Sequence, residues 1–290
     1  MSVSDTAKHA LTIGHAAQNG LAEVARPAHR LRRLPVARPW PGWKVAAVQL
    51  LILAGLTAAW EGGARVGLIN PFFWSQPSAI AATLATFVES GAASVDIAST
   101  FSATLLGFVI GTAVGAMLGL SFWWSRNYAA VLQPYIICFE SVPKLALAPL
   151  VILVFGMGLA SKVAIATALT LVVSTLTAHA GVKAVDPDGE RLFYSLGASR
   201  MQTFRKLVVP ACLPWIISIL RVNIGLALTG SVVGEFIASE HGLGRTIFYA
   251  GQTYDIALVW VAVLVLSCLS VAMYLAVSAL EKWLRRGVLH

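Results

Sequence analysis

The segment GVKAVDPDGERLFYSLGASRMQTFRKLVVPACLPW (Gly181–Trp215) is the most polar and turn-rich part of a chain that is otherwise strongly apolar. Asp186 is a good N-cap, and Pro187 suits the first position of a helix. Acidic residues follow in the first turn, where the helix dipole favours negative charge. Gly197 can adopt the left-handed conformation that ends many helices. The pattern predicts a short helix from Pro187 to about Leu196.

A second helix is predicted directly after the glycine turn. Ser199 and Gln202 are three residues apart, which is the spacing of a capping box. This helix carries three basic residues before it enters an apolar run, where Pro210 and Pro214 are expected to bend it. The segment is therefore a capped helix, a sharp turn and a second helix that leads into an apolar stretch.

The first helix of this pair carries the apolar side chains of Leu192, Phe193 and Leu196, and we expect all three to be exposed. The chain contains no soluble domain that would cover them. An exposed apolar knob of this kind is typical of a docking site for another protein. A helix lying on lipid headgroups is the alternative. The residues of the helix alone leave both possibilities open.

The composition identifies an integral membrane protein. Of the 290 residues, 58% are hydrophobic and 12% are charged, whereas a soluble domain has a charged fraction of about 25%. Several apolar runs approach the ~20 residues that span a bilayer. We predict an all-α protein with six transmembrane helices at residues 44–60, 97–123, 129–155, 162–181, 207–236 and 256–280. The third contains Pro143 and Pro149 and should be kinked or broken.

The distribution of Lys and Arg predicts the orientation in the membrane. Sixteen of the 21 basic residues fall in the N-terminal tail, the C-terminal tail and the two connections on the same side, against three in the alternate connections. The positive-inside rule then places both termini and the polar segment in the cytoplasm. The net charge of +8 reflects this topology. No folded basic domain is present that would bind nucleic acid.

These predictions divide the chain into five parts. They are a disordered, basic cytoplasmic tail (1–43), a first transmembrane helix (44–60), an extracytoplasmic connection with an interfacial helix near 77–89 (61–95), a core transmembrane domain with a cytoplasmic loop at 182–206 (96–281), and a short cytoplasmic tail (282–290). No signal peptide is expected. Three well-separated cysteines give neither a metal site nor a disulfide framework.

Glycines recur every four residues in the second predicted span, at Gly107, Gly111, Gly115 and Gly119. Such a stripe lets another helix approach closely. The partner helix belongs either to the same subunit or to a second one. The only histidine of a predicted span, His179, is expected to be a hydrogen-bonded packing residue.

Four ionisable residues fall within or near the spans, and we take them as candidates for the translocation pathway: Glu140, Lys144, Arg221 and Glu235. Each should face protein or water, because charge in the bilayer core costs at least ~2.5 kcal/mol. Glu140 and Lys144 are four residues apart and can form an ion pair. The alternative role for Lys144 is to attract an anion. Arg221 either bonds carbonyl groups near the cytoplasmic end or acts as a positive element on an anion path.

The polar segment resembles the EAA-x3-G-x9-I-x-L-P signature of the membrane subunits of binding-protein-dependent ABC importers. Gly197 occupies the glycine of the signature and Pro210 its proline. The glutamate and the second alanine of the signature fall on Arg191 and Phe193, with Glu190 one place early, so the sequence departs from the signature at these positions, where family members vary.

Further motifs are similar to those of the nitrate, sulfonate and taurine permeases. They come in the same order and cover residues 77–280: SVPKLALAPLVILVFGMG (Ser141–Gly158), SLGAS (Ser195–Ser199), Pro210 with Pro214 and Arg221, Glu235, and GLG (Gly242–Gly244).

This resemblance implies a type I importer permease in a bacterial inner membrane, and it favours protein docking over lipid contact for the polar loop. Two permeases, expected to be a homodimer, would pair with two cytoplasmic ATPase subunits and an extracytoplasmic binding protein. The chain has no phosphate-binding loop of its own and should bind no cofactor. ATP and Mg would bind to the ATPase. The solute would be a small anion such as a sulfonate, taurine, nitrate or bicarbonate; related permeases also carry vitamin precursors and aromatic acids. The implied coupling residues are Asp186, Pro187, Glu190, Arg191, Leu192, Phe193, Leu196, Gly197, Ala198, Ser199 and Pro210.

Two other classes of protein are compatible with the composition. A secondary transporter predicts internal repeats and ion ligands at mid-membrane depth, and neither is found in the sequence. A membrane-embedded enzyme needs a catalytic cluster at one depth, yet the six histidines are scattered along the chain. Neither alternative explains the capped loop, and no catalytic residue is assigned.

Overall fold

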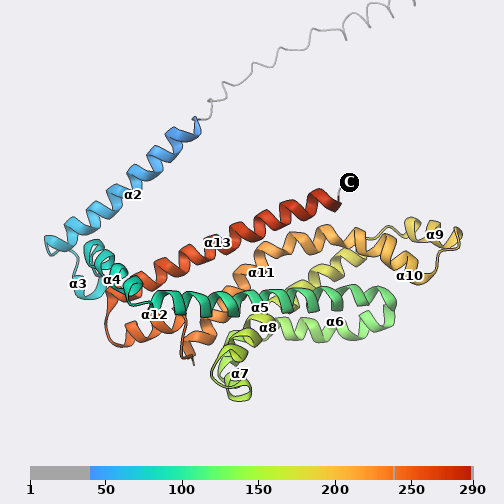
Figure 1. Cartoon of the computed structure of the whole chain (residues 1–290). Coiled ribbons are helices and arrows are strands. Elements are labelled where there is room, and N and C mark those ends of the chain that lie inside the picture. Colours follow the sequence, from blue (N-terminus) through green and yellow to red (C-terminus); the bar gives the residue numbers. More distant parts are fainter. Residues whose placement is uncertain (1–39, 238, 289–290) are drawn as a thin grey trace, which may run out of the picture. The chain divides into compact units, whose positions relative to one another are not determined.

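A computed structural model describes residues 40–237 and 239–288, and all regular structure within them is helical (Figure 1). Most of the predicted tail at 1–43 lies outside the described residues. By its internal contacts the chain divides into two units, Met1–Gly55 and Leu56–His290. In the first unit, the described residues comprise the start of α2, where nearly every side chain is exposed. Exposure of this kind suits a helix that lipid or another protein surrounds.

The elements follow one another along the chain with short connections. Their bounds are α2 Gly42–Arg65, α3 Pro71–Trp74, α4 Pro77–Glu89, α5 Ala92–Ser121, η1 Phe122–Trp124, α6 Arg126–Ser141, η2 Lys144–Leu147, α7 Ala148–Phe155, α8 Leu159–Lys183, α9 Pro187–Ser195, α10 Arg200–Thr203, η3 Phe204–Val208, α11 Val209–Ile237, α12 Leu243–Gln252 and α13 Ile256–Val288.

Within the described residues, length and composition give six candidate membrane spans if a bent pair counts as one. Five are long and apolar enough to span a bilayer, and the sixth consists of α6 and the η2–α7 segment, which meet at 78°. The predicted break of the third span is confirmed: α6 ends just before Pro143, and Pro149 is the second residue of α7. A proline is tolerated there because the first turn of a helix has no intrahelical acceptor for its N–H.

The core of the second unit is formed by α5, α8 and α11. The glycine stripe of α5 faces α8 of the same chain, which decides between the two predicted roles. A Cβ atom at Gly107 would lie 2.3 Å from the Ala166 Cβ, and one at Gly111 would lie 1.9 Å from the Thr170 Oγ1. The two helix backbones are therefore in contact along this line, which only glycine permits.

Hydrogen bonds between small polar side chains join the same three helices. The amide nitrogen of Asn223 on α11 donates to Thr112 of α5 at 2.9 Å and to Ser174 of α8 at 2.6 Å. The hydroxyls of Thr104 and Ser231 lie 2.7 Å apart. These bonds satisfy polar groups that lipid cannot, and they fix the register of α11 against its neighbours.

Apolar clusters attach the outer helices to this core. One cluster joins α5 and α11 to α13 through Phe108, Ile217, Ile224, Met273 and Val277. A second cluster joins α4, α5, α12 and α13 near the other end of α5 through Ile80, Phe87, Ala93, Leu243 and Val261.

The fifth span is one continuous run of 38 residues, Arg200–Ile237, made of α10, η3 and α11. The π turn η3 ends at Val208, two residues before Pro210. Proline has no N–H to donate to the carbonyl four residues earlier, and a widened turn is one way in which a helix accommodates that loss.

A single methyl group at the α5–α8 contact should destabilise the protein. We expect Gly111→Ala to lower the free energy of unfolding by about 1–3 kcal/mol through overpacking, since its Cβ would overlap Thr170. Gly225→Ala on α11 is the matched control because no atom lies within 4 Å of its added Cβ. That variant should be neutral or slightly stabilising. Thermal unfolding in detergent measures both, and equal effects would contradict the contact.

Candidate functional site

The polar loop has the predicted architecture. The Asp186 side chain accepts a hydrogen bond from the backbone N–H of Asp188 at 3.0 Å and caps α9. After α9, Gly197 adopts a left-handed conformation with φ +76°. The N–H of Ala198 donates to the Phe193 carbonyl, and the N–H of Gly197 donates to the Tyr194 carbonyl, both at 3.0 Å. Together these two bonds form a Schellman motif, which satisfies the last carbonyls of the helix.

The second half of the loop is capped reciprocally. The Ser199 N–H donates to the Gln202 side chain at 2.7 Å, and the Gln202 N–H donates to the Ser199 hydroxyl at 3.3 Å. This capping box begins α10 at Arg200, as predicted. Both short helices therefore have their terminal backbone groups bonded locally, which makes the turn between them well defined.

Two tryptophans of η1 tie the loop to the transmembrane core. The Trp123 indole donates to the Glu190 carboxylate at 2.9 Å. The Arg200 guanidinium lies over the Trp123 and Trp124 rings and donates to the Trp124 carbonyl. Beneath them, Val185 and Val208 are buried with several aromatic and aliphatic neighbours. The role of these tryptophans was not predicted, although a Trp pair beside a basic connection is a signal for such an anchor.

The outer face of α9 is apolar and uncovered. Leu192 is 57% exposed and Leu196 is 76% exposed. The prediction that Phe193 is exposed is wrong, because its side chain is half-buried. It lies one helical turn after Gly189, which faces Leu207 in η3, so this side of α9 points toward the second helix.

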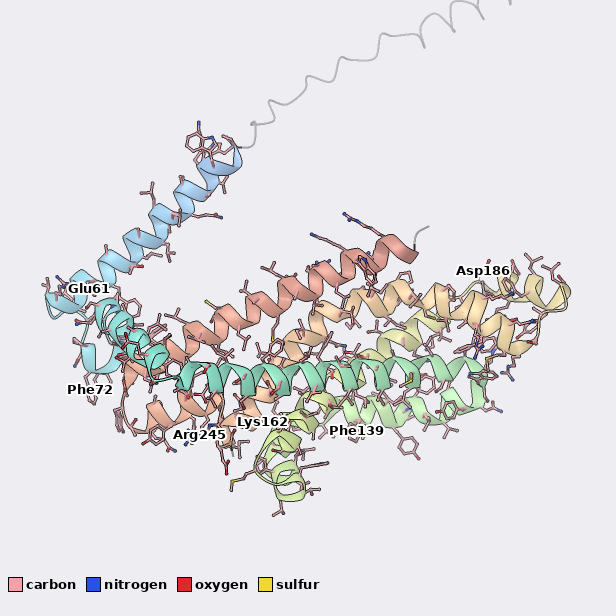
Figure 2. The ribbon with its side chains drawn as sticks, in the orientation of Figure 1. Glu61, Phe72, Phe139, Lys162, Asp186 and Arg245 are labelled. Atoms are coloured by element: carbon pink, nitrogen blue, oxygen red, sulfur yellow. The ribbon has the colours of Figure 1, made fainter. Side chains whose placement is uncertain are left out.

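The remaining polar residues of α9 are accessible. Asp186 is exposed, and Arg191 forms an exposed ion pair with Asp188 at 2.9 Å. Figure 2 shows Asp186 at one end of the second unit, while Glu61, Phe72 and Arg245 lie at the other.

The candidate pair Glu140 and Lys144 lies at the bend between α6 and α7. The Lys144 ammonium donates to the carbonyl of Glu140 at 3.1 Å and pairs with its carboxylate at 3.4 Å. The predicted ion pair is confirmed. The Glu140 side chain is more exposed than that of Lys144, so the pair presents a carboxylate at its accessible edge.

Arg221 has a partner that the sequence pattern did not indicate. Its guanidinium donates to the carboxylate of Glu281 on α13, and Arg285 pairs with the same carboxylate at 2.9 Å. Glu281 is buried. This three-residue network links α11 to the last turns of α13 and holds Arg221 in a fixed position.

Glu235 lies in a buried network at the other end of α11. Its carboxylate pairs with Lys162 at 3.3 Å and accepts hydrogen bonds from the Thr100 hydroxyl at 2.9–3.0 Å and from the Gly244 N–H at 2.9 Å. Three segments that are far apart in the sequence therefore meet at one carboxylate. The bonds satisfy the charge that burial would otherwise penalise.

Lys162, the first residue of the predicted span 162–181, lies in the first turn of α8 and is only 3% exposed. Its burial and its pairing with Glu235 were not predicted from the sequence. Besides Glu235, its ammonium donates to the Ser99 hydroxyl at 2.8 Å and to the His241 carbonyl at 2.6 Å. The position of a lysine at the border of an apolar run does not predict whether it will pair with a carboxylate on another helix.

The GLG motif closes over this carboxylate. A Cβ atom at Gly242 would lie 2.1 Å from the nearer Glu235 oxygen, and one at Gly244 would lie 2.8 Å from the Val232 carbonyl. Gly242 also has a φ of +134°, which other residues rarely adopt. Its N–H donates to Asp96 at 2.8 Å. Both glycines are therefore required for the loop to cover the ion pair. We call the set of Glu235, Lys162, Thr100, Gly242 and Gly244 the Glu235 lock.

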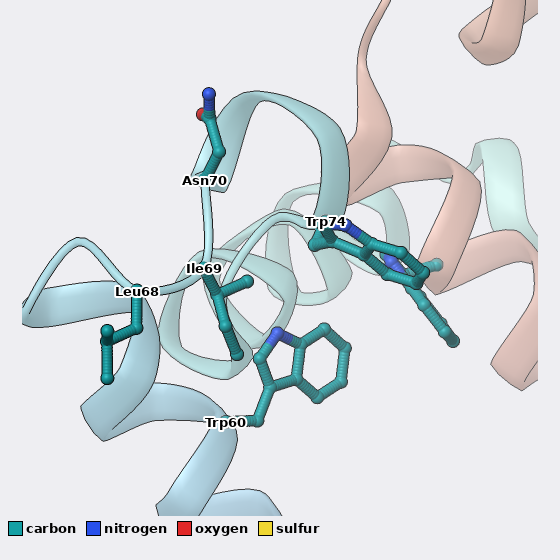
Figure 3. A pocket seen from close by; sticks show the side chains of 6 residues that line it. Trp60, Leu68, Ile69, Asn70 and Trp74 are labelled. Carbon is teal, nitrogen blue, oxygen red and sulfur yellow. The ribbon is translucent and has the colours of Figure 1, made fainter.

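An aromatic cavity of about 490 Å³ lies near the end of α2 (Figure 3). Its lining includes three tryptophans, Trp60, Trp74 and Trp260. The only amide in the lining, Asn70, already caps α3. The cavity therefore has few free polar groups, and its composition is typical of the aromatic belt at a membrane interface. Among the residues that the structure describes, no group of His, Cys, Asp and Glu side chains is arranged to hold a metal ion.

Comparison with known proteins identifies the family. The family "Binding-protein-dependent transport system inner membrane component" matches residues 111–288. The chain is 30% identical over 263 residues to the riboflavin transport system permease protein of Chloroflexus aurantiacus, covering 91% of this chain and 96% of that protein. It is also 30% identical to the taurine transport system permease protein of Escherichia coli, covering 84% of this chain and 90% of that protein.

The fold is that of solved ABC importer permeases. A chain of the MetNI methionine ABC transporter, solved in inward-facing conformations, superposes with a TM-score of 0.54 at 18% identity, covering 69% of this chain and 95% of that one. The protein belongs to the binding-protein-dependent inner membrane components. It is thus a transport subunit of the inner membrane, and neither a secondary transporter nor an enzyme.

Removing one partner of the Glu235 lock should destabilise the protein strongly. We expect Lys162→Met and Glu235→Gln each to lower the free energy of unfolding by about 3–5 kcal/mol, because each leaves a buried polar group without its partner. The double variant should lose less than the sum of the two. Arg191→Gln, which breaks an exposed pair, is the control and should have little effect. Additive losses in thermal unfolding would show that the pair is not coupled.

Proposed function

We propose that this chain is one half of a permease homodimer that imports a small anionic solute, with sulfonates such as taurine as the leading class. Two cytoplasmic ATPase subunits, which bind ATP and Mg, dock on α9 and drive the cycle. An extracytoplasmic binding protein delivers the solute. The observation that carries this proposal is the rigid, uncovered knob formed by Leu192 and Leu196 at the end of the polar loop.

The loop has the properties that a coupling element needs. A helix of nine residues is about 14 Å long and would not persist alone in water. Caps at both of its ends and the bond from Trp123 to Glu190 hold α9 in place. The exposed leucines provide an apolar anchor, and the exposed charges around them provide a polar rim, as in many protein interfaces. A displacement of α9 by the ATPase would then be transmitted to α10 and α11, because the described residues between them contain no flexible loop that would absorb it.

The proposed orientation of the protein in the membrane is supported by its charge distribution. Lys183 ends α8, Arg191 lies in α9 and Arg200 begins α10, so all three belong to the same segment as Asp186, and the positive-inside rule assigns this segment to the cytoplasm. The Glu235 lock, at the opposite end of α11, then lies toward the extracytoplasmic side. One end of the α10–α11 helix would thus lie near the ATPase, and the other end would lie near the entrance for the solute.

The geometry of the bent span formed by α6, η2 and α7 supports the proposal of a second permease subunit. Lipid cannot bond the terminal backbone groups of α6 and η2, so their break must face protein or water. At 16 residues α6 is roughly 24 Å long, too short to cross the ~30 Å hydrocarbon core alone. One face of α6 exposes Tyr128, Val131, Tyr135 and Phe139 at helical spacing. We assign this face to contact with a second copy, with the break beside a shared pathway.

Two of the relatives and Lys144 support the proposed solute class, although another relative is a riboflavin permease. Among the similar proteins, one is a taurine permease and another a putative aliphatic sulfonate permease. At the bend, the Lys144 ammonium is a cation that pairs with the more exposed Glu140 carboxylate at 3.4 Å, and we propose that the sulfonate group of the solute displaces this carboxylate. Arg221, fixed by Glu281, is a second cation nearer the proposed cytoplasmic end.

Polar substitution of the knob should abolish ATPase binding. We expect Leu192→Asp with Leu196→Asp to remove the ATPase from the purified complex, because burying two carboxylates in an apolar interface is costly. The variant should insert and fold normally, since both side chains are exposed. Co-purification with quantitative mass spectrometry measures the ATPase. Val66→Asp, at an exposed apolar residue after α2, is the control and should retain it. Undiminished ATPase in the double variant would refute the docking site.

Loss of the bend cation should impair transport without loss of assembly. In proteoliposomes that contain the complete importer, Lys144→Gln should reduce taurine uptake roughly tenfold, the effect of one charge-assisted contact worth ~1.5 kcal/mol or more. Arg65→Gln breaks another i,i+4 pair, with Glu61, and should leave uptake unchanged. Unchanged uptake in Lys144→Gln, with taurine shown to bind the delivering protein, would exclude Lys144 from the pathway.

A further inference from the structure

A cavity of about 440 Å³ lies between α6, α8 and the start of α9, outside the sites described so far. This volume falls within the ~300–1,000 Å³ range typical of small-molecule sites. Pro187 and Glu190 of α9 form one wall, so the cavity adjoins the polar loop. The polar side chains of its lining are those of Trp123, Arg126, Gln133, His179, Lys183 and Glu190.

The lining carries two cations without counter-ions. Within residues 40–237 and 239–288, no carboxylate forms an ion pair with Arg126 or Lys183. The one acidic residue of the lining, Glu190, already accepts a hydrogen bond from Trp123. With a neutral histidine, the formal charge of the lining is positive. An anion that entered would meet donors from α6 and α8 on opposite sides.

His179, which also lines the cavity, has no hydrogen-bond partner for its ring among the described residues. The prediction of a hydrogen-bonded packing residue is wrong: the side chain is only 8% exposed, and both ring nitrogens are buried without a hydrogen-bond partner. Its ring packs edge-on against Phe122, with centroids 4.8 Å apart. Buried polar groups in native proteins nearly always have partners, so an imidazole with two orphan nitrogens that lines a cavity points to a missing ligand.

The shape of the surroundings indicates an amphiphile. A second cavity of about 570 Å³ shares Ala130 and Gln133 with the first and continues along α6 past Pro134, Ile137 and Cys138. Apart from Gln133, its lining side chains have no strong hydrogen-bonding group. A basic recess thus opens into an apolar groove along one helix face. Basic pockets between transmembrane helices on the cytoplasmic side are sites where anionic lipid headgroups bind.

We propose that this cavity binds a phosphate group through Arg126, Lys183 and His179, and that the apolar groove along α6 takes an acyl chain of the same anionic phospholipid. Free inorganic phosphate offers the same headgroup chemistry. A bound phosphate would connect α6 and α8 directly beside the wall that α9 provides. The lipid composition would in this way control the stability of the contact between the polar loop and the transmembrane helices. The site depends on neither the sulfonate substrate nor the ATPase contact proposed above.

The test uses the full-length chain in nanodiscs, and it measures the thermal midpoint together with retained lipid by native mass spectrometry. One arm adds phosphatidylglycerol to phosphatidylcholine, and the other adds inorganic phosphate to phosphatidylcholine alone. Stabilisation by phosphatidylglycerol only assigns the site to a lipid, and stabilisation by both assigns it to the headgroup chemistry. Stabilisation by phosphate only assigns it to a free anion. No stabilisation in either arm would overturn the site.

Variants connect the effect to the cavity. Arg126→Gln and Lys183→Gln should each weaken binding roughly tenfold, the loss expected for one charge-assisted hydrogen bond. Lys282→Gln, which removes an exposed lysine of α13 outside the cavity, should bind like the unaltered chain. An effect that persists when Arg126 and Lys183 are both replaced would overturn the proposal.

His179→Phe separates a ligand role from a packing role. Because neither ring nitrogen has a partner, the ligand-free variant should keep its thermal midpoint. Its stabilisation by the ligand should be smaller than that of the unaltered chain. Full stabilisation in this variant would remove His179 from the set of ligand donors that we propose.

Discussion

Four glycines at four-residue spacing bring the backbone of α5 against α8, and the arrangement of the other core helices follows from this contact. In lipid, apolar side chains gain little by meeting one another, so helices associate through close packing and hydrogen bonds. The glycines provide the first, and the hydroxyl and amide groups of Thr112, Ser174 and Asn223 provide the second. With α5 and α8 in contact, α11 has a single position in which Asn223 reaches both.

The same three helices support the Glu235 lock, whose members come from segments far apart in the chain. Thr100 comes from α5, Lys162 from α8 and Glu235 from α11, and the GLG loop covers them. A buried ion pair adds little net stability over an apolar pair of similar volume, but it is sensitive to geometry. The lock therefore specifies how the helix ends meet and which conformation the connection to α12 adopts.

Much of this organisation was predictable from local patterns. Caps, the glycine turn and the break at Pro143 depend on neighbouring residues, so the sequence indicates them directly, and the structure agrees at Asp186, Gly197 and Ser199. Contacts across the fold were not predictable in this way. No spacing rule connects Lys162 with Glu235, or Arg221 with Glu281, because each pair depends on the packing of separate helices.

Exposure was also predicted incompletely. The half-buried position of Phe193 depends on where the second helix of the loop lies, which a helical pattern does not contain. The lack of a hydrogen-bond partner for His179 was not predictable for a similar reason. It depends on the packing of Phe122 and on a cavity that several elements line. Family resemblance identified the transport role well, since the motifs that carry it are local and come in a fixed order.

The continuous helix from Arg200 to Ile237 has a mechanical consequence. At 1.5 Å per residue its 38 residues extend over roughly 57 Å, more than the thickness of a bilayer. One of its ends begins at the capping box and the other reaches the Glu235 carboxylate. A displacement imposed at one membrane face therefore reaches the opposite face along a single helix. The π turn before Pro210 and the interior Pro214 are two places along it where the regular hydrogen bonding of the helix is interrupted, so the helix bends most easily there.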